Sequence, residues 1–296
     1  MTAFWQDIIS GVMIGSLYAL IALGFVLIYK SSQVLNFAQG EVVMFGGFIA
    51  VALVASYSIA LPIAFLLTLV CAGLIGLVIE RGLLRPLIGK PLISIVMATI
   101  GLASVLRGLA PMLWGSSTKS FPDSFLNDNR PIDFLGVPVA RISLWSFGFA
   151  VLFVVLFGLF FKFTRTGLAM QAVADDQQAA MSMGISVPRV FAWSWGIALV
   201  VAAIGGTILG NRQGVDISLA TIGLKVFPVV ILGGLDSITG AIVAGIAIGV
   251  IENLAGTYVD PHVGGGFKDV APYVVMVIVL MIRPYGLFGS PEIERV

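Results

Sequence analysis

The sequence predicts an all-α polytopic membrane protein, a bundle of about eight to ten transmembrane helices, some of them interrupted. Of its 296 residues, 59% are hydrophobic and 10% are charged, and the mean hydropathy is +1.08. A water-soluble surface needs roughly a quarter of its residues charged, so this chain must be solvated by lipid. Several apolar windows are also long enough to cross the hydrocarbon core, which takes about 20 helical residues. We therefore expect a single transmembrane domain over residues 1–296.

Charge and side-chain chemistry exclude several classes of function. The net charge is +1, with 16 Lys and Arg against 15 Asp and Glu, so no strongly basic face is available for nucleic acid. A single cysteine, Cys71, cannot form a disulfide within the chain, and a single histidine, His262, cannot build a histidine-based metal site alone. We expect no resident metal, no cofactor bound by this chain and no nucleic-acid partner.

The sequence has no motif for ATP binding or for catalysis. A phosphate-binding P-loop needs a glycine, four residues and then Gly-Lys-Ser/Thr. The Gly-Lys pair of this chain, Gly89 and Lys90, has Leu84 in place of the first glycine and Pro91 in place of the hydroxyl residue. Serine-hydrolase and zinc-protease motifs are absent as well. We expect a non-catalytic protein.

Nine apolar windows account for the expected crossings. They lie at residues 8–29, 42–55, 59–79, 92–114, 142–161, 190–210, 226–235, 238–256 and 270–282. The first window is longer than the core of a signal peptide and is expected to be a retained span. Three windows, at 42–55, 226–235 and 270–282, are short, and short windows can be re-entrant rather than spanning.

Two connecting segments are long enough to carry a function of their own. If the N-terminus lies outside, the inner segments hold more Lys and Arg than the outer ones, which is the expected bias. Residues 115–141 are polar and proline-containing, which is typical of an outer loop. Residues 162–189 mix good helix formers with polar residues, which predicts a short amphipathic helical hairpin inside the cell.

Small residues recur at a spacing of four, which places them on one helix face and lets backbones approach closely in lipid. The sets are Gly11 with Gly15, Gly206 with Gly210 and Gly214, and Gly245 with Gly249. We expect them to serve helix packing in a compact bundle.

Two polar segments interrupt the apolar pattern. Residues 31–41 are polar and precede a short window with Gly46 and Gly47. Residues 218–235 repeat this plan, with a polar start, an apolar run broken by Pro228, and the pair Gly233 and Gly234. Interrupted helices at corresponding places predict a substrate path, because free helix ends offer N–H and C=O groups at membrane depth. The alternative is that both are ordinary interfacial loops.

Three ionisable residues lie in or against apolar windows: Glu41, Arg107 and Glu252. Arg107 and Glu252 are close to predicted outer ends, where their side chains are expected to snorkel to the interface. Glu41 clusters with Asn36 and Gln39, and this set suits a zwitterionic solute because amides donate and accept while the carboxylate attracts an ammonium. The predicted translocation path comprises Asn36, Gln39, Glu41, Thr221, Leu224, Gly233 and Gly234.

Five sequence blocks together carry a family resemblance. They are GSLYALIALGFVLIY at 15–29, NFAQGEVVMFGGF at 36–48, TGLAMQAVADDQQAAMSMGI at 166–185, VVILGGLDSITGAIVAG at 229–245 and RPYGLFG at 283–289. On these blocks the chain resembles, nearly end to end, the permease subunits of bacterial branched-chain amino-acid ABC importers, the Liv-type permeases. One departure is Gln39, where members of that family commonly have histidine.

The resemblance implies a permease subunit of an ATP-driven, binding-protein-dependent ABC importer in the bacterial inner membrane, for branched-chain or other hydrophobic amino acids. It implies as partners a homologous second permease, two ATPase subunits that use ATP and Mg, and an external substrate-binding protein. It also makes the segment at 162–189 a cytoplasmic coupling loop that docks on the ATPase. The matching positions are Asp175, Asp176, Ala179, Ala180 and Gly184.

Other functions stay open at this stage. Relatives within the family carry urea, short amides or aromatic acids, so the same machinery with another cargo is one alternative. A self-contained channel or ion-coupled transporter is the alternative from a different class, because the missing P-loop fits it equally. The helical inner loop and the family resemblance favour the importer.

Overall fold

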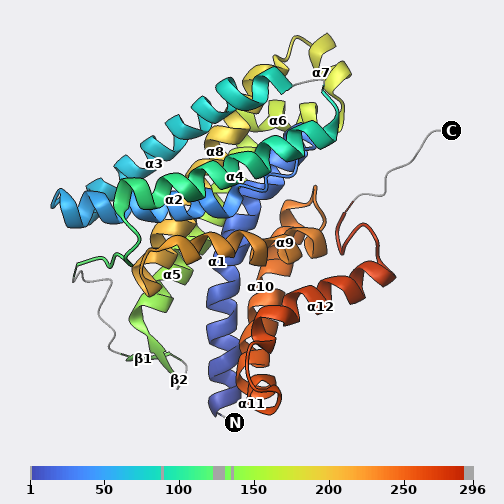
Figure 1. The fold of residues 1–296 in the computed structure, drawn as a ribbon. Helices are drawn as coiled ribbons and strands as arrows, with labels where there is room; N and C mark the ends of the chain where they lie inside the picture. Colours follow the sequence, from blue (N-terminus) through green and yellow to red (C-terminus); the bar gives the residue numbers. More distant parts are fainter. Residues whose placement is uncertain (1, 88–89, 123–130, 135–136, 290–296) are drawn as a thin grey trace. The chain divides into compact units, whose positions relative to one another are not determined.

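The computed structural model describes residues 2–87, 90–122, 131–134 and 137–289, and these are predominantly helical (Figure 1). The longer helices are α1 (Thr2–Ser32), α2 (Gln39–Val51), α3 (Leu61–Ile79), α4 (Leu92–Trp114), α5 (Arg141–Phe163), α8 (Val187–Gln213), α9 (Ile222–Gly233), α10 (Ile238–Leu254) and α12 (Phe267–Ile282). The shorter elements are α6 (Arg165–Asp175), α7 (Gln177–Ser182), α11 (Asp260–Val263), and the π or 3₁₀ turns η1 (Ala52–Ser56), η2 (Glu80–Leu84), η3 (Arg85–Leu87), η5 (Ile217–Thr221) and η6 (Ala255–Val259).

Each of the nine predicted windows overlaps one of these longer helices, although the windows at 42–55 and 238–256 extend into η1 and η6, and those at 59–79 and 226–235 extend two residues beyond α3 and α9. Seven helical stretches within the described residues are long and apolar enough to cross a membrane: Phe4–Ser32, Gln39–Ser56, Leu61–Leu87, Leu92–Trp114, Arg141–Phe163, Val187–Gln213 and Ile238–Val263. The other two windows form the shorter helices α9 and α12. The all-α polytopic fold class is therefore confirmed.

The chain divides into two compact units. One comprises Met1–Val26, Asp128–Val151 and Leu224–Val296, and the other comprises Leu27–Asn127 and Leu152–Gly223. We call them the terminal unit and the central unit. The interrupted segment that begins α2 lies in the central unit, and the second half of the other interrupted segment lies in the terminal unit.

Helices α2 and α8 form the core of the central unit. In α8, 78% of the apolar window is buried, whereas 11% of the α4 window is buried. Helix α2 approaches α8 at backbone distance: a Cβ at Gly206 would lie 1.9 Å from the Val43 carbonyl oxygen, and one at Gly46 would lie 2.4 Å from the Cα of Ala203. Lipid is as apolar as these side chains, so close backbone approach supplies the packing contact. Helices α3 and α4 turn apolar side chains outward.

The terminal unit contains a second glycine contact, between α1 and α10. A Cβ at Gly249 would lie 2.4 Å from the Gly15 backbone, and one at Gly11 would lie 2.6 Å from the Cα of Val250. The predicted role of these glycines in helix packing is confirmed. Gly214 has an additional role, because it follows α8 with a φ of 86° and ends that helix; a Cβ there would also lie 2.8 Å from Cγ2 of Thr118.

One local prediction gains detail and another needs correction. Residues 115–141 were expected to be an outer loop, and within this segment β1 (Pro131–Phe134) and β2 (Val137–Ala140) form an antiparallel hairpin; residues 123–130 lie outside the described residues. Pro228 was expected to break its apolar run, but α9 continues through it. A proline removes one backbone donor, which a helix held by its neighbours tolerates. The helix ends instead before Gly234, whose φ is 105°.

Candidate functional site

The predicted break between the first two helices is present and lies inside the protein. Helix α1 ends at Ser32, where Gln33 takes a φ of 53°, and the chain is non-helical until α2 begins at Gln39. Asn36 and Gln39 are 0% exposed and Glu41 is 3% exposed. An ordinary interfacial loop would expose these side chains to water. The segment is instead a buried polar site.

Asn36 organises the start of α2. Its Nδ2 donates to Oε1 of Gln39 at 3.0 Å, and its Oδ1 accepts from the backbone N–H of Ala38 at 3.1 Å. The second bond satisfies a backbone N–H that the start of a helix leaves unpaired, and the first holds the Gln39 side chain against Asn36. Within the described chain, Nε2 of Gln39 is buried and has no hydrogen-bond partner. A buried donor without a partner is costly, so this amide is available to a ligand group or a water molecule.

Helix α4 supplies the second set of contacts. The hydroxyl of Thr99, which is fully buried, lies 2.9 Å from the carbonyl oxygen of Val96 and 3.3 Å from that of Leu35. It also accepts from the backbone N–H of Phe37 at 3.4 Å. Thr99 therefore supports the non-helical backbone from across the unit, a role that sequence reasoning missed.

Arg107 of α4 forms an ion pair with Glu41 of α2. The Glu41 side chain is 4% exposed and the Arg107 side chain is 56% exposed. The ion pair was not foreseen in the snorkelling prediction for Arg107, which itself stays a prediction: the guanidinium contacts a carboxylate on a neighbouring helix. An uncompensated charge at the centre of a span costs about 2.5–3.5 kcal/mol, so the pair stabilises both helices against lipid.

The two interrupted segments meet in the central unit. A Cβ at Gly40 would lie 2.1 Å from the carbonyl oxygen of Ala220 and 2.9 Å from the Cα of Gly223. Only glycine permits this approach, so the start of α2 rests directly on the turn from η5 into α9. Thr221, in that turn, is exposed and donates to the carbonyl oxygen of Ser218 at 2.7 Å.

The remaining predicted path residues lie in the terminal unit and do not form a cluster there. Leu224 is 57% exposed. Gly233 packs on the backbone of Gly240, where an added Cβ would lie 2.4 Å from the carbonyl carbon, and Gly234 packs on the backbone of Gly289 at 2.5 Å. Both glycines therefore have a packing role in this structure.

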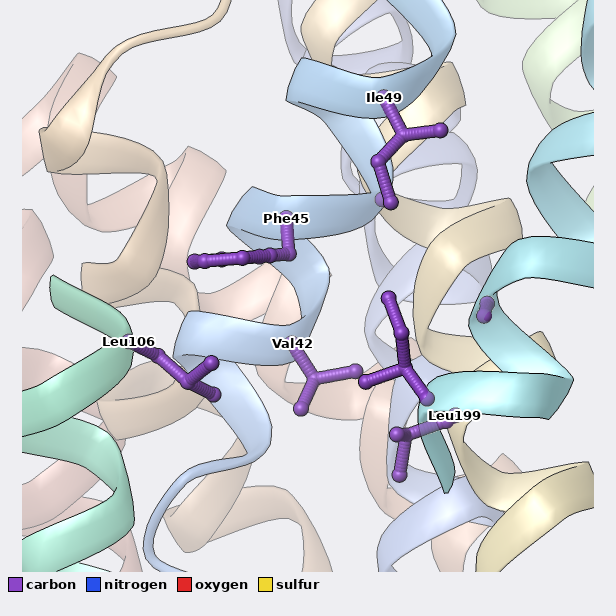
Figure 2. Close-up of a pocket in the computed structure, with 8 residues that line it drawn as sticks. Val42, Phe45, Ile49, Leu106 and Leu199 are labelled. Atoms are coloured by element: carbon purple, nitrogen blue, oxygen red, sulfur yellow. The ribbon is translucent and has the colours of Figure 1, made fainter. Parts of the chain in front are cut away.

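A small apolar pocket lies beside the polar site (Figure 2). Val42, Phe45 and Ile49 of α2 line it together with Leu106 of α4 and Leu199 of α8. Its cavity volume is about 10 Å³, which is room for about one water molecule. The conformation described here therefore has no space for an aliphatic side chain at this point.

The predicted helical hairpin between α5 and α8 is confirmed. Thr164 caps α6 by accepting from the N–H of Gly167 at 3.0 Å, and Asp176 caps α7 by accepting from the N–H groups of Gln178 and Ala179 at 2.8 and 2.9 Å. Asp175 ends α6 and is exposed. These caps stabilise α6 and α7, which are too short to be stable as isolated helices.

The end of α7 presents two exposed methionines. Gly184 has a φ of 82°, and the bonds from its N–H to the carbonyl of Met181 and from the Ile185 N–H to the carbonyl of Ala180 form a glycine-terminated helix end. Ala180 is buried, whereas Met181 is 54% and Met183 is 83% exposed. Sequence reasoning missed both methionines, although two apolar residues in a polar connection were a usable signal.

A second charged cluster lies in the terminal unit. Nζ of Lys225 lies 2.5 Å from Oε1 of Glu252 and 2.8 Å from Oδ1 of Asp269, and the Tyr18 hydroxyl donates to Oε2 of Glu252 at 2.7 Å. These residues come from α1, α9, α10 and α12. The snorkelling prediction for Glu252 did not include these partners: its carboxylate is held by a lysine and a tyrosine.

Asp216, between α8 and η5, orders the loop that precedes the second interruption. Its carboxylate accepts from the Ser218 hydroxyl at 2.5 Å and from the Thr118 hydroxyl at 3.1 Å. The hydrogen bond from Ser218, and after it the one from Thr118, hold the pKa of the Asp216 carboxyl below its usual value despite partial burial.

Within the described residues no three His, Cys, Asp or Glu side chains are placed to hold a metal ion.

Comparisons with known proteins identify the family that this chain matches. The family described as "Branched-chain amino acid transport system / permease component" matches residues 8–282. The high-affinity branched-chain amino acid transport system permease protein LivH of Salmonella typhimurium is 30% identical over 99% of this chain and 98% of its own. The corresponding protein BraD of Pseudomonas aeruginosa is 31% identical over the same shares. A probable branched-chain amino acid transport permease LivH of Methanocaldococcus jannaschii is 30% identical over 95% of this chain and 92% of its own.

A solved structure shares the fold. PsaBC from Streptococcus pneumoniae, solved in complex with Fab, aligns with a TM-score of 0.55 over 95% of this chain and 92% of that chain, at 15% sequence identity. This likeness supports the fold alone.

The charged cluster of the terminal unit yields a prediction about stability. Lys225→Met leaves Glu252, whose side chain is 12% exposed, without its cation, and this should cost roughly 2 kcal/mol after allowance for partial exposure. The midpoint of thermal unfolding of the detergent-solubilised chain should fall by roughly 4–8 °C. The double variant Lys225→Met/Glu252→Gln should recover at least half of this loss. If Lys225→Met unfolds at the wild-type temperature, the cluster does not hold these helices together.

Proposed function

The chain belongs to the family of permease components of branched-chain amino acid transport systems, and from that premise we propose the following function. The chain is the transmembrane subunit of an ATP-driven, binding-protein-dependent ABC importer for branched-chain or other hydrophobic amino acids. It resides in the cell inner membrane as a multi-pass protein. The observation that carries the proposal is the family match from the first to the last apolar helix.

Energy and substrate capture are assigned to partners. The sequence has no P-loop, so ATP and Mg belong to two ATPase subunits, and this chain binds no cofactor of its own. An external binding protein supplies the cargo, and a homologous second permease completes the pathway. This chain forms part of the pathway wall. It also provides the surface through which conformational changes of the ATPase subunits reach the permease.

The buried break at the start of α2 suits the pathway wall. Asn36 and Gln39 offer amide donors and acceptors, and Nε2 of Gln39 has no partner in the described structure. The contact of Gly40 with Gly223 joins this break to the second interrupted segment. A site of amides and backbone ends binds a polar solute weakly, which favours release in an importer whose affinity resides in the binding protein.

The hairpin of α6 and α7 suits the coupling surface. Asp175, Asp176, Ala179, Ala180 and Gly184 build and end the short helices, and they fix the position of the loop tip. The apolar contact itself is proposed for the exposed methionines that follow Ala180. Flexible methionine side chains adapt to a groove on a partner.

The test of the proposed function is ATP-driven uptake. Vesicles that contain only this chain should neither hydrolyse ATP nor accumulate leucine. Addition of the second permease, the ATPase subunits and the binding protein should produce both activities. ATP-dependent leucine accumulation by the chain alone would reject the subunit role. Accumulation by the chain alone that follows an ion gradient would indicate an ion-coupled transporter instead.

The coupling surface yields a separate prediction. Met183→Gln should raise the dissociation constant between the permease pair and the ATPase subunits roughly tenfold, because burial of a methionine is worth about 1.5–3 kcal/mol and each 1.4 kcal/mol is tenfold. Gln177→Ala, on the same helix, is the matched control and should leave the constant within twofold. Equal affinities for the wild type and Met183→Gln would place the docking contact elsewhere. Gly184→Leu is a poorer probe, because its positive φ makes any bulky residue strain the helix end.

A further inference from the structure

Arg107 is an exposed cation on a helix that otherwise presents apolar side chains. It lies seven residues before the end of α4, about 10 Å of helix inside the span. Its same-face neighbours three residues away are Ser104, which is exposed, and Ala110, which is buried. A guanidinium at this depth that is not buried in the protein is expected to face water or another polar group.

Glu41 occupies only a small part of this guanidinium. The recorded contact runs from one terminal nitrogen, Nη2, to Oε1 of Glu41, whereas a guanidinium has five N–H donors in a fixed planar fork. In the described part of the chain, Glu41 is the one recorded partner of Arg107. Most of the fork is therefore free to bind a further acceptor.

A second arginine–glutamate pair in the same unit provides an internal comparison. Arg85 donates through both Nε and Nη2 to the two oxygens of Glu80, each at 3.1 Å. The glutamate of that pair is 2% exposed and its arginine is 40% exposed, so the two pairs have similar burial. Arg85 uses both Nε and Nη2 on its own carboxylate, whereas Arg107 uses Nη2 alone on Glu41 and keeps its Nε and Nη1 donors for another acceptor.

Glu41 is poorly placed to meet a solute. Its side chain is 4% exposed and its charge is already balanced by Arg107, so it does not offer a free carboxylate to an ammonium group. The charged group that a passing solute encounters is the guanidinium. The planar fork of arginine matches a carboxylate in geometry and charge.

On the premise of the proposed function, we propose that Arg107 is the specificity-determining residue that binds the carboxylate of the solute on the translocation path. Glu41 is the positioning residue, which holds the guanidinium by Nη2 and leaves the Nε and Nη1 donors for the solute. The apolar pocket starts at Val42 and Leu106, the chain neighbours of this pair. In a conformation that widens this pocket beyond the volume of about one water molecule, a solute with a carboxylate and an aliphatic side chain is favoured over urea or a simple amide.

The first test removes the charge without leaving a buried carboxylate unpaired. Glu41→Gln/Arg107→Gln would be assembled with its partners in vesicles, and ATP-driven leucine uptake would be measured beside the amount of assembled complex. The uptake rate should fall at least tenfold while the amount of complex stays within twofold of wild type. The matched control, Glu80→Gln/Arg85→Gln, should keep uptake within twofold. Wild-type uptake by the first double variant would overturn the proposal.

The second test restores a positive charge chemically. Arg107→Cys would be made together with Glu41→Gln and Cys71→Ala, and the assembled complex would be treated with an aminoethyl or a methyl methanethiosulfonate. The cationic adduct should support leucine uptake at least threefold faster than the neutral adduct, at equal amounts of complex. Equal uptake with both adducts would overturn the proposal. So would a gain that follows the amount of assembled complex, because Arg107 would then contact a partner subunit.

Uptake measurements on the wild-type complex distinguish a failure of this proposal from a failure of the proposed function. If it shows no ATP-dependent uptake of any tested solute, the proposed function fails. If it accumulates urea or acetamide in an ATP-dependent manner but not leucine, ATP-driven import stands and carboxylate recognition by Arg107 is overturned. Leucine uptake in the wild type that is lost in Glu41→Gln/Arg107→Gln supports both.

Discussion

Backbone groups that leave a helix inside a membrane protein must find partners within the protein, because lipid offers none. The segment between α1 and α2 meets this constraint with few side chains. Asn36 folds back on the start of α2, and Thr99 reaches across from α4 to the backbone at Leu35 and Phe37. Because these hydrogen bonds satisfy the non-helical backbone, the polar break can be buried. The rest of the candidate site depends on them.

Two further contacts tie the break to its surroundings. The contact of Gly40 with Gly223 brings the start of α2 against the turn into α9 at a distance that excludes any side chain. The pair of Glu41 with Arg107 joins α2 to α4. A shift of α4 would therefore act on the polar segment through both Thr99 and Arg107. Such a connection gives a helix rearrangement a direct route to the groups that face the solute.

Local signals predicted much of the fold. Apolar runs of sufficient length located all nine longer helices, because lipid solvation depends on composition over a window. Good helix formers with polar residues between them predicted the hairpin of α6 and α7. The polar break at residues 31–41 was visible for the same reason: a run of polar residues between two apolar windows is a local pattern.

Pairings between distant residues could not be predicted in this way. Glu41 and Arg107 were each recognised as unusual, but nothing in their spacing indicates that they meet. Nothing in the spacing of Lys225 and Glu252 indicates that they meet either. Snorkelling was therefore the default interpretation for Arg107 and Glu252. Pro228 was expected to break a helix because its neighbours on adjoining helices were unknown. The assignment of Gly233 and Gly234 to the translocation path stays a prediction, and their backbone contacts indicate packing.

The central claim is that the buried break at the start of α2 borders a path that opens during the transport cycle. It is tested most directly by cysteine labelling at position 39 in the assembled complex, with Cys71 replaced by alanine. Because Gln39 is 0% exposed in this structure, the account predicts protection from a small water-soluble thiol reagent in one state. When the resting and the ATP-trapped complexes are compared, the account predicts that the reagent labels position 39 in one of these two states and not in the other. Protection in both states, in a complex that still transports leucine, would contradict it.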